Sequence, residues 1–236
     1  MSADPTICYL SAVDAQTNFK MRRLSPVELV TNLIDRIEAV EPRVNAFTYK
    51  FYEKALLQAK EAEIRFGKRK NNIRRLEGLP IVIKDYHDVK GEITTYGSRL
   101  FQSHRPIKSL AYIDRLQRAG AILLARTTTP EFAYLGVTHS DLWGVTRNPW
   151  NLHMSPGGSS GGAGAALAAG MTTLADGSDI GGSIRIPAAC CGIVGLKPSH
   201  GRVPSGGAWG MDPFLAYGPL TRTVADCSLM MNVMAG

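Results

Sequence analysis

The sequence predicts an α/β domain in which helices and strands alternate along the chain. A short apolar run at residues 79–84, "LPIVIK", follows a glycine and is typical of a buried strand. A second apolar run at residues 121–126, "AILLAR", follows a helical pattern through the single link Gly120. The 236 residues, 44% of them hydrophobic, suffice for one large core, and no repeat or linker divides them. We therefore expect a single domain.

The clearest predicted helix covers "LSPVELVTNLIDRIEAVEP". Ser25 is its predicted N-cap, Pro26 suits the first turn, and Glu28 completes a capping box. Its apolar residues recur at helical spacing on one face: Val27, Val30, Leu33, Ile34 and Ile37. A second helix is predicted over residues 51–64 and ends near Gly67.

Later segments continue the alternation. "SLAYIDRLQRAG" predicts a helix that Ser109 caps and Gly120 ends, whereas "THSDLWGVTRNPWN" is typical of an irregular loop. "AGAALAAG" predicts a helix of small residues, and "TTLADG" a short strand and turn. "IRIPAACCG" indicates another helix, whose start Pro187 restricts, and "TVADCSLMMNVMAG" a terminal helix.

Composition excludes several classes of protein. No apolar run approaches the roughly 18 residues that span a bilayer. The N-terminal "MSADPTICYLSAVDAQ" has acidic residues where a secretory signal needs a basic start and an apolar middle. We therefore expect a cytoplasmic protein. Its four cysteines form no C-x-x-C pair and predict reduced thiols rather than a metal site: Cys8, Cys190, Cys191 and Cys227.

The net charge of +7 is concentrated most densely in "RFGKRKNNIRR" at residues 65–75. Such a run can bind nucleic acid. No aromatic stacking residues follow it, and the chain has no nucleic-acid motif. We interpret the run as a solvated loop between a helix and a strand, and we do not expect a nucleic-acid partner.

Two glycine-rich stretches, residues 155–170 and 177–188, indicate close approach of the backbone to a ligand or to another segment. A phosphate loop is excluded because no Gly-Lys-Ser/Thr follows the glycines, and a dinucleotide fingerprint because Leu167 replaces its third glycine. The alternative is an oxyanion hole. Successive backbone N–H groups from Ile180 to Ser183 can point at one atom, and a serine at the end of such a turn suits a nucleophile.

A nucleophilic serine needs a base. None of the histidines lies in a motif that marks a base, and we expect each to be a surface or loop residue: His87, His104, His139, His153 and His200. A neutral lysine can take this role. Lys84 ends an apolar strand, where burial disfavours its charge; a base at pH 7 requires its pKa to fall by about 3. The alternative is a lysine whose amine reaches bulk water.

The motifs "GLPIVIKD", "SPGGSSGG" and "GSDIGGSIRIPAACCGIVGLKPSHGRV" resemble the amidase signature family, and the match continues to the terminal helix. The resemblance implies a mixed, mostly parallel twisted sheet with helices on both faces. It also implies a Ser-Ser-Lys triad that hydrolyses amides without a metal ion or cofactor. By motif, the nucleophile is Ser183, the bridging serine is Ser159, with a cis Gly158–Ser159 bond, and the base is Lys84. The implied oxyanion donors are the N–H groups of Ile180, Gly181, Gly182 and Ser183.

Further residues follow from the same resemblance. Asp179 and Arg185 flank the nucleophile and are expected to support it, with a plain surface ion pair as the alternative. Ser160 competes with its neighbour for the bridging role. Ala133 and Tyr134, in "PEFAYLG", match a loop that lines the acyl pocket, and a role in core packing is equally open.

Members of this family are about twice as long as the chain. We therefore expect the N-terminal half of the domain over residues 1–236, incomplete at its C-terminal side and at most weakly active alone. The expected partners are a small amide substrate and either a second copy or a complementing C-terminal segment. The leading function is an amidohydrolase acting on a small carboxamide or N-acyl amine. The alternatives are the amidase subunit of a glutamyl-tRNA amidotransferase, which usually has Gln at the position of Ile186, and a non-catalytic scaffold.

Overall fold

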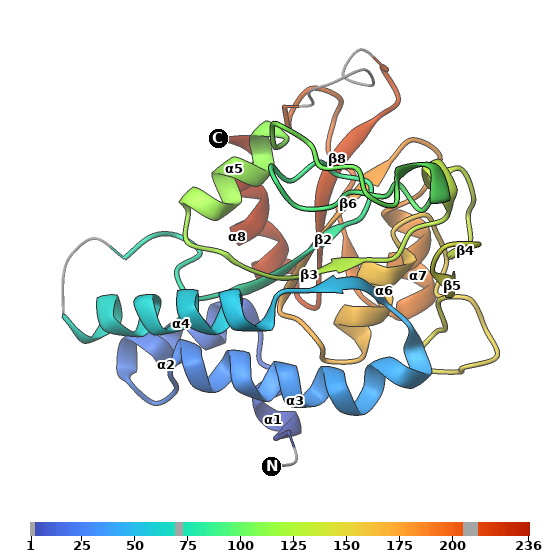
Figure 1. Cartoon of the computed structure of the whole chain (residues 1–236). Coiled ribbons are helices and arrows are strands. Elements are labelled where there is room, and N and C mark those ends of the chain that lie inside the picture. Colours follow the sequence, from blue (N-terminus) through green and yellow to red (C-terminus); the bar gives the residue numbers. More distant parts are fainter. Residues whose placement is uncertain (1–2, 69–72, 205–211) are drawn as a thin grey trace.

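A central six-stranded sheet organises the chain (Figure 1), whose computed structural model describes residues 3–68, 73–204 and 212–236. The strands lie in the order β1-β3-β2-β6-β8-β7. Their bounds are β1 (Phe47–Lys50), β2 (Pro80–Lys84), β3 (Ile122–Thr127), β6 (Leu174–Asp179), β7 (Val194–Gly195) and β8 (Ala216–Thr221). Every residue of β2, β3, β6 and β8 is buried, so these strands form the middle of the core.

The sheet is mixed, with its parallel part at the centre. β2 pairs in parallel with β3 and with β6, while β1 is antiparallel to β3. β8 is antiparallel to both β6 and β7. β7 therefore runs with the three central strands, and most strands point the same way. The predicted fold class, a mixed and mostly parallel sheet between helices, is confirmed.

Helices cover both faces of the sheet (Figure 1): α5 (Ala111–Arg118) and α8 (Val224–Ala235) lie on one face, and α6 (Gly161–Ala168) and α7 (Arg185–Cys191) on the other. The chain moves in one direction along the sheet from β2 through α5 to β3, and in the opposite direction from β3 through α6 to β6. Because such crossovers are right-handed, opposite directions place the helices on opposite faces.

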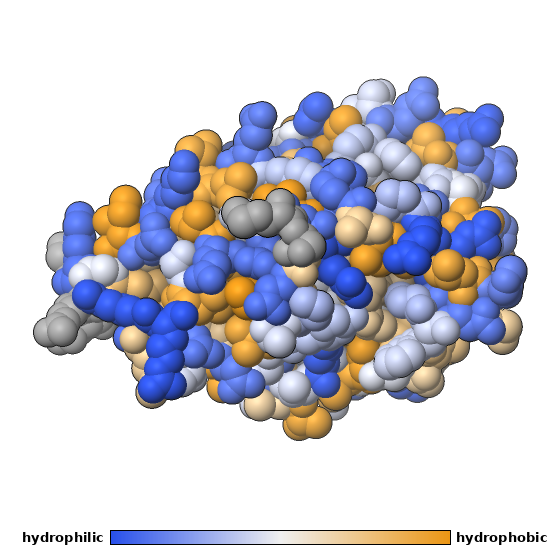
Figure 2. Space-filling model, turned by 90° about the horizontal axis from the view of Figure 1, so that it is seen from below, coloured by the Kyte–Doolittle hydropathy of each residue, from blue (hydrophilic) through white to orange (hydrophobic). Residues whose placement is uncertain are grey.

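The N-terminal helices form an outer layer below the sheet (Figure 1). They are α1 (Pro5–Cys8), α2 (Ala12–Met21), α3 (Pro26–Val44) and α4 (Tyr52–Gly67). Seen from below, this side mixes hydrophilic and hydrophobic residues, as solvated helix faces do (Figure 2). As predicted, the Ser25 side chain caps α3 by accepting a hydrogen bond from the Glu28 N–H at 3.0 Å.

Several predicted boundaries are wrong. Ser109 does not cap α5, because its hydroxyl accepts a hydrogen bond from the Lys90 N–H at 3.0 Å and the helix begins only at Ala111. The loop predicted over residues 138–151 contains two short paired strands. These strands are β4 (His139–Ser140) and β5 (Gly144–Val145), and two short 3₁₀ helices complete the elements, η1 (Arg99–Phe101) and η2 (Glu131–Ala133).

The local sequence does not predict the C-terminal strand β8, since "AYGPLT" has glycine and proline at its centre. Pro219 nevertheless lies opposite Asp176 of β6 in a regular antiparallel register. Burial between two strands and a helix outweighs the weak local preference of this segment for a strand.

The basic run at residues 65–75 is described only at its ends, because residues 69–72 lie outside the described part of the chain. There, Arg65 and Arg74 bind the buried carboxylate of Glu77 at 3.1 and 2.6 Å. These two cations are therefore engaged within the chain. Within the described residues, no helix combines the length and the apolar character that crossing a bilayer requires.

Candidate active site

A buried amine lies at the carboxyl end of the parallel strands. Lys84, the last residue of β2, has no solvent exposure. Its Nζ donates hydrogen bonds to Ser159 Oγ at 2.7 Å and to Ser178 Oγ at 3.2 Å. The alternative of a lysine that reaches bulk water is therefore wrong. Three polar side chains from β2, β6 and the loop before α6 instead meet inside the protein.

Burial changes the acidity of this amine. Loss of hydration lowers the pKa of Lys84 to about 7, although the carboxylates of Asp176 and Asp179 act in the opposite direction. A large fraction of Lys84 is therefore unprotonated at neutral pH. An unprotonated amine in contact with a hydroxyl can accept its proton, which is the first requirement for a general base.

The loop before α6 brings Ser159 to this amine. The bond between Gly158 and Ser159 is cis, as the resemblance implies. A Cβ atom at Gly158 would lie 2.6 Å from the backbone nitrogen of Val137, so only glycine fits against this neighbouring segment. The glycine-rich stretch therefore approaches another part of the chain at Gly158, namely the segment around Val137.

Ser160 lies beside Ser159 and makes different contacts. Its N–H donates a hydrogen bond to the Ser183 carbonyl oxygen at 3.2 Å, which joins the loop before α6 to the turn after β6. Its hydroxyl is buried and has no hydrogen-bond partner within the described residues. Of the two adjacent serines, only Ser159 forms a hydrogen bond with Lys84 within the described residues.

The turn after β6 is built around Asp179. Its buried carboxylate accepts the N–H of Gly182 at 2.8 Å, the N–H of Ile184 at 3.2 Å, and both Nε and Nη2 of Arg185 at 2.9 and 2.8 Å. Burial raises the pKa of Asp179, but the bonds to Arg185 and to the backbone outweigh it and hold the pKa below its usual value. A plain surface ion pair does not describe this contact, because one partner is completely buried.

The structure differs from expectation at one of the four implied oxyanion donors. The Gly182 N–H points to Asp179 and is not free for a ligand. Gly182 has a φ of 122°, a conformation that favours glycine, so it shapes the turn instead. Within the described part of the chain, the N–H groups of Ile180, Gly181 and Ser183 make no hydrogen bond. Ser183 is itself partly exposed, and its hydroxyl forms no hydrogen bond with described residues.

A buried network that the sequence does not predict lies behind Lys84. Asp176 accepts the backbone N–H of Lys84 and the hydroxyl of Tyr112, both at 2.7 Å. His87 Nδ1 lies 2.7 Å from the same carboxylate. His87 lies in the loop after β2, which fits the expectation of a loop residue, but its side chain is fully buried rather than on the surface. The other four histidines are exposed.

The protonation states in this network follow from burial. Burial lowers the pKa of His87 despite the nearby Asp176, so the imidazole is neutral and donates Nδ1–H. Burial raises the pKa of Asp176, but its hydrogen bonds to His87 and Tyr112 prevail and hold it below its usual value. A signal for this network is present in the sequence. Asp176 and Ser178 stand two residues apart in an otherwise apolar or small segment, the spacing that places side chains on one face of a strand.

Apolar side chains are exposed on the turn and on the segment 132–137, which approaches it: a Cβ atom at Gly136 would lie 3.9 Å from Ile186 Cδ1. Tyr134 is 89% exposed, which excludes a role in core packing, and Ala133 is partly exposed. Ile186 packs against Gly157 and against Gly182, the residue before Ser183. We call the exposed set the apolar rim: Phe132, Tyr134, Leu135, Val137, Ile180 and Ile186.

Known proteins resemble this chain over almost its whole length. A family profile described as Amidase matches residues 28–236. The chain is 43% identical over 229 residues to an acylamidase of Rhodococcus erythropolis, covering 97% of this chain and 48% of that protein. It is 42% identical over 231 residues to a glutamyl-tRNA(Gln) amidotransferase subunit of Methylacidiphilum infernorum, covering 96% and 44%.

Among solved structures, a bacterial aryl acylamidase of the amidase signature enzymes superposes with a TM-score of 0.91 at 37% identity. That alignment covers 97% of this chain and 48% of the other. The chain thus spans about half the length of the relatives it matches.

Burial of the Lys84 amine predicts a specific dependence of stability on pH. The folded pKa of about 7 lies below the unfolded value near 10.5, so the folded state binds fewer protons between these pH values. The resulting penalty, about 5 kcal/mol, is complete below pH 7 and disappears as the pH approaches 10.5. We expect Lys84→Met to be more stable relative to wild type at pH 6 than at pH 10, by at least about 2 kcal/mol.

Urea unfolding of both chains at the two pH values measures this difference. Lys90→Met, at an exposed lysine, serves as the control and should show no such pH dependence. An equal stability difference at both pH values for Lys84→Met would mean that the amine titrates normally.

Proposed function

The chain belongs to the amidase signature family, and we propose that it is an amidohydrolase that cleaves a carboxamide or an N-acyl amine through an acyl-enzyme. The observation that carries the proposal is the 2.7 Å contact between the buried Lys84 Nζ and Ser159 Oγ. A neutral amine in this position can draw a proton through one hydroxyl from a second serine. Ser183 follows the turn that adjoins this loop and is the nucleophile in the proposal.

In the proposed reaction, Lys84 Nζ takes the proton of Ser159 Oγ while Ser159 Oγ takes that of Ser183. Ser183 Oγ then bonds to the carbonyl carbon, and the carbonyl electron pair moves to oxygen. The N–H groups of Ile180, Gly181 and Ser183 stabilise this oxyanion. The relay returns the proton to the leaving amine as the C–N bond breaks, and water hydrolyses the acyl-enzyme by the same route.

Two carboxylates position these groups in the proposal. Asp179 holds the turn through the Gly182 N–H and through Arg185. The N–H groups of Ile180, Gly181 and Ser183 stay unbonded within the described residues. Asp176 binds the backbone of Lys84, and its negative charge keeps the amine from becoming a still weaker base. Neither carboxylate takes part in the proton relay.

The apolar rim supports a substrate whose acyl group is apolar or aromatic. Tyr134, Ile180 and Ile186 are exposed, and none offers a charged partner. The competing function, a glutaminase that delivers ammonia to partner subunits, needs groups that recognise the charged amino and carboxylate ends of glutamine. Ile186 is apolar where amidotransferase subunits usually have Gln, which favours the amidohydrolase.

The exposure of the apolar rim also supports a partner that binds there and covers it. Tyr134 at 89% and Ile180 at 48% exposure leave apolar area of the rim in water. We propose that a complementing C-terminal segment, or a second copy of the chain, covers this area and completes the substrate cleft.

Cysteine usage supports a cytoplasmic location within the same proposal. All four cysteines are unbridged. Burial raises the pKa of Cys191 to about 12, so its thiol is inert. Adjacent unbridged thiols such as Cys190 and Cys191 fit a reducing compartment.

The nucleophile can be tested directly with a fluorophosphonate probe, which labels activated serines. We expect mass spectrometry to locate the label on Ser183 and Ser183→Ala to abolish it. Ser160→Ala, the matched serine without a contact to Lys84, should keep the label. Hydrolysis of an aryl acetamide should fall by at least about 10³-fold in Ser183→Ala. An unlabelled Ser183 in the wild-type chain would favour the scaffold alternative.

The proposed base predicts a pH profile. Protonated Lys84 cannot accept a proton, so the labelling rate should rise about tenfold per pH unit below its pKa and level off above about 7. Asp176→Asn removes a charge that raises this pKa, so the midpoint should move to lower pH. Labelling rates from pH 5 to 9 measure both midpoints, and a midpoint that Asp176→Asn leaves in place would contradict this role.

If a C-terminal segment completes the substrate cleft, adding such a segment should increase the rate of hydrolysis. We expect a fusion that continues from Gly236 into the C-terminal half of the Rhodococcus erythropolis acylamidase to hydrolyse an aryl acetamide at least about tenfold faster than the chain alone. A fusion no faster than the chain would show that the rim does not need a cover for activity.

A further inference from the structure

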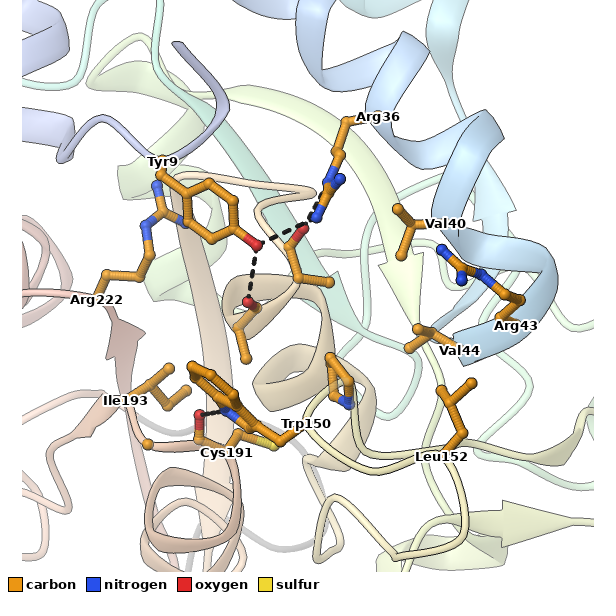
Figure 3. A pocket seen from close by; sticks show the side chains of 14 residues that line it. Tyr9, Arg36, Val40, Arg43, Val44, Trp150, Leu152, Cys191, Ile193 and Arg222 are labelled. Carbon is orange, nitrogen blue, oxygen red and sulfur yellow. Dashed lines mark hydrogen bonds between the residues drawn. The ribbon is translucent and has the colours of Figure 1, made fainter. Parts of the chain in front are cut away.

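A cavity lies away from Ser183, between α3 and the C-terminal ends of α6 and α7 (Figure 3). Its volume is about 530 Å³, within the range of small-molecule sites. α6 begins directly after Ser160 and its last residue, Ala168, lines the cavity. The cavity and the proposed active site therefore lie at opposite ends of the same helix, about 12 Å long.

One part of the cavity is apolar and rigid. Trp150 is 75% exposed, yet its Nε1 donates a hydrogen bond to the Cys191 carbonyl oxygen at 2.8 Å. The indole is thus held in place with its polar atom satisfied and its apolar face open. Val40 and Val44 of α3 lie across from Trp150 in Figure 3. An indole and branched side chains facing one another are suited to an aromatic or aliphatic group.

The other part of the cavity is cationic. Arg36, Arg43 and Arg222 line it, and no carboxylate is among the described residues of its wall. Arg36 is held by the Ala169 carbonyl oxygen at 2.9 Å and the Tyr9 hydroxyl at 3.2 Å. These bonds fix the charge of Arg36 in the wall but leave it few free donors.

Arg222 and Arg43 differ in how many of their hydrogen-bond donors are already used within the chain. Arg222 donates to backbone carbonyl oxygens, among them those of Thr172 and Leu10. Arg43 forms no hydrogen bond and no ion pair within the described residues, so its planar fork of donors is available. The cavity therefore combines two fixed positive charges with one free guanidinium.

We propose that this cavity binds an organic monocarboxylate with an aromatic or branched apolar body. The carboxylate pairs with the fork of Arg43, which matches its two oxygens in geometry. Arg36 and Arg222 contribute long-range attraction, and the body lies between Trp150 and the valines of α3. A single free fork favours a planar monoanion over a phosphate dianion, which needs more free donors.

Isothermal titration calorimetry with 4-phenylbutyrate tests the proposal, with 4-phenylbutanol as the neutral probe of matched shape. We expect Arg43→Gln to weaken binding of the acid at least tenfold, and wild type to bind the alcohol at least tenfold more weakly than the acid. Arg118→Gln, at an exposed helical arginine outside the cavity, should leave binding unchanged. Circular dichroism confirms that each variant is folded.

Further measurements distinguish binding in this cavity from binding at the proposed active site, and a monocarboxylate from other ligands. Ser183→Ala should bind 4-phenylbutyrate as wild type does, so that binding stands even if the proposed hydrolysis fails. No detectable binding at millimolar acid, equal binding of the alcohol, or full binding by Arg43→Gln would overturn the proposal. Tighter binding of phenyl phosphate than of the acid would overturn the monocarboxylate class.

Discussion

The burial of one amine is the constraint on which the rest of the site depends. Lys84 lies at the end of a strand that is covered on both faces, and water does not reach its Nζ. A charged ammonium is costly in such a place, so the amine favours its neutral form. The hydroxyls of Ser159 and Ser178 satisfy it without adding charge, and Asp176 approaches the backbone of Lys84 rather than its amine.

The parallel centre of the sheet explains how these groups meet. β2 and β6 are neighbours and end at the same edge, so Lys84 and the turn after Asp179 emerge side by side. Loops at the carboxyl ends of parallel strands are the usual place for ligand sites in α/β proteins. The loop before α6 then closes over this edge, where Gly158 removes the side chain that would collide with Val137.

The backbone N–H groups of the turn after β6 fall into two sets, one bonded to Asp179 and one unbonded. Asp179 uses the Gly182 N–H to hold the turn, and its pairing with Arg185 keeps this buried carboxylate ionised. The N–H groups on either side of Gly182 remain unbonded within the described chain. In the proposed mechanism these unbonded donors stabilise the developing oxyanion, and a turn held by Asp179 would keep them in place for it.

Features that depend on the local pattern of residues could be predicted without a structure. Neighbouring residues predict the buried strands β2 and β3 and the Ser25 cap of α3. They also carry the motifs around Lys84 and Ser183. The partner of each buried polar group, in contrast, depends on segments that lie far apart in the sequence. Ser109 binds Lys90 instead of capping α5, His87 is buried against Asp176, and the Gly182 N–H turns to Asp179. The strand β8 forms despite its glycine and proline for the same reason: contacts between distant segments outweigh local preference once burial removes water as a competing partner.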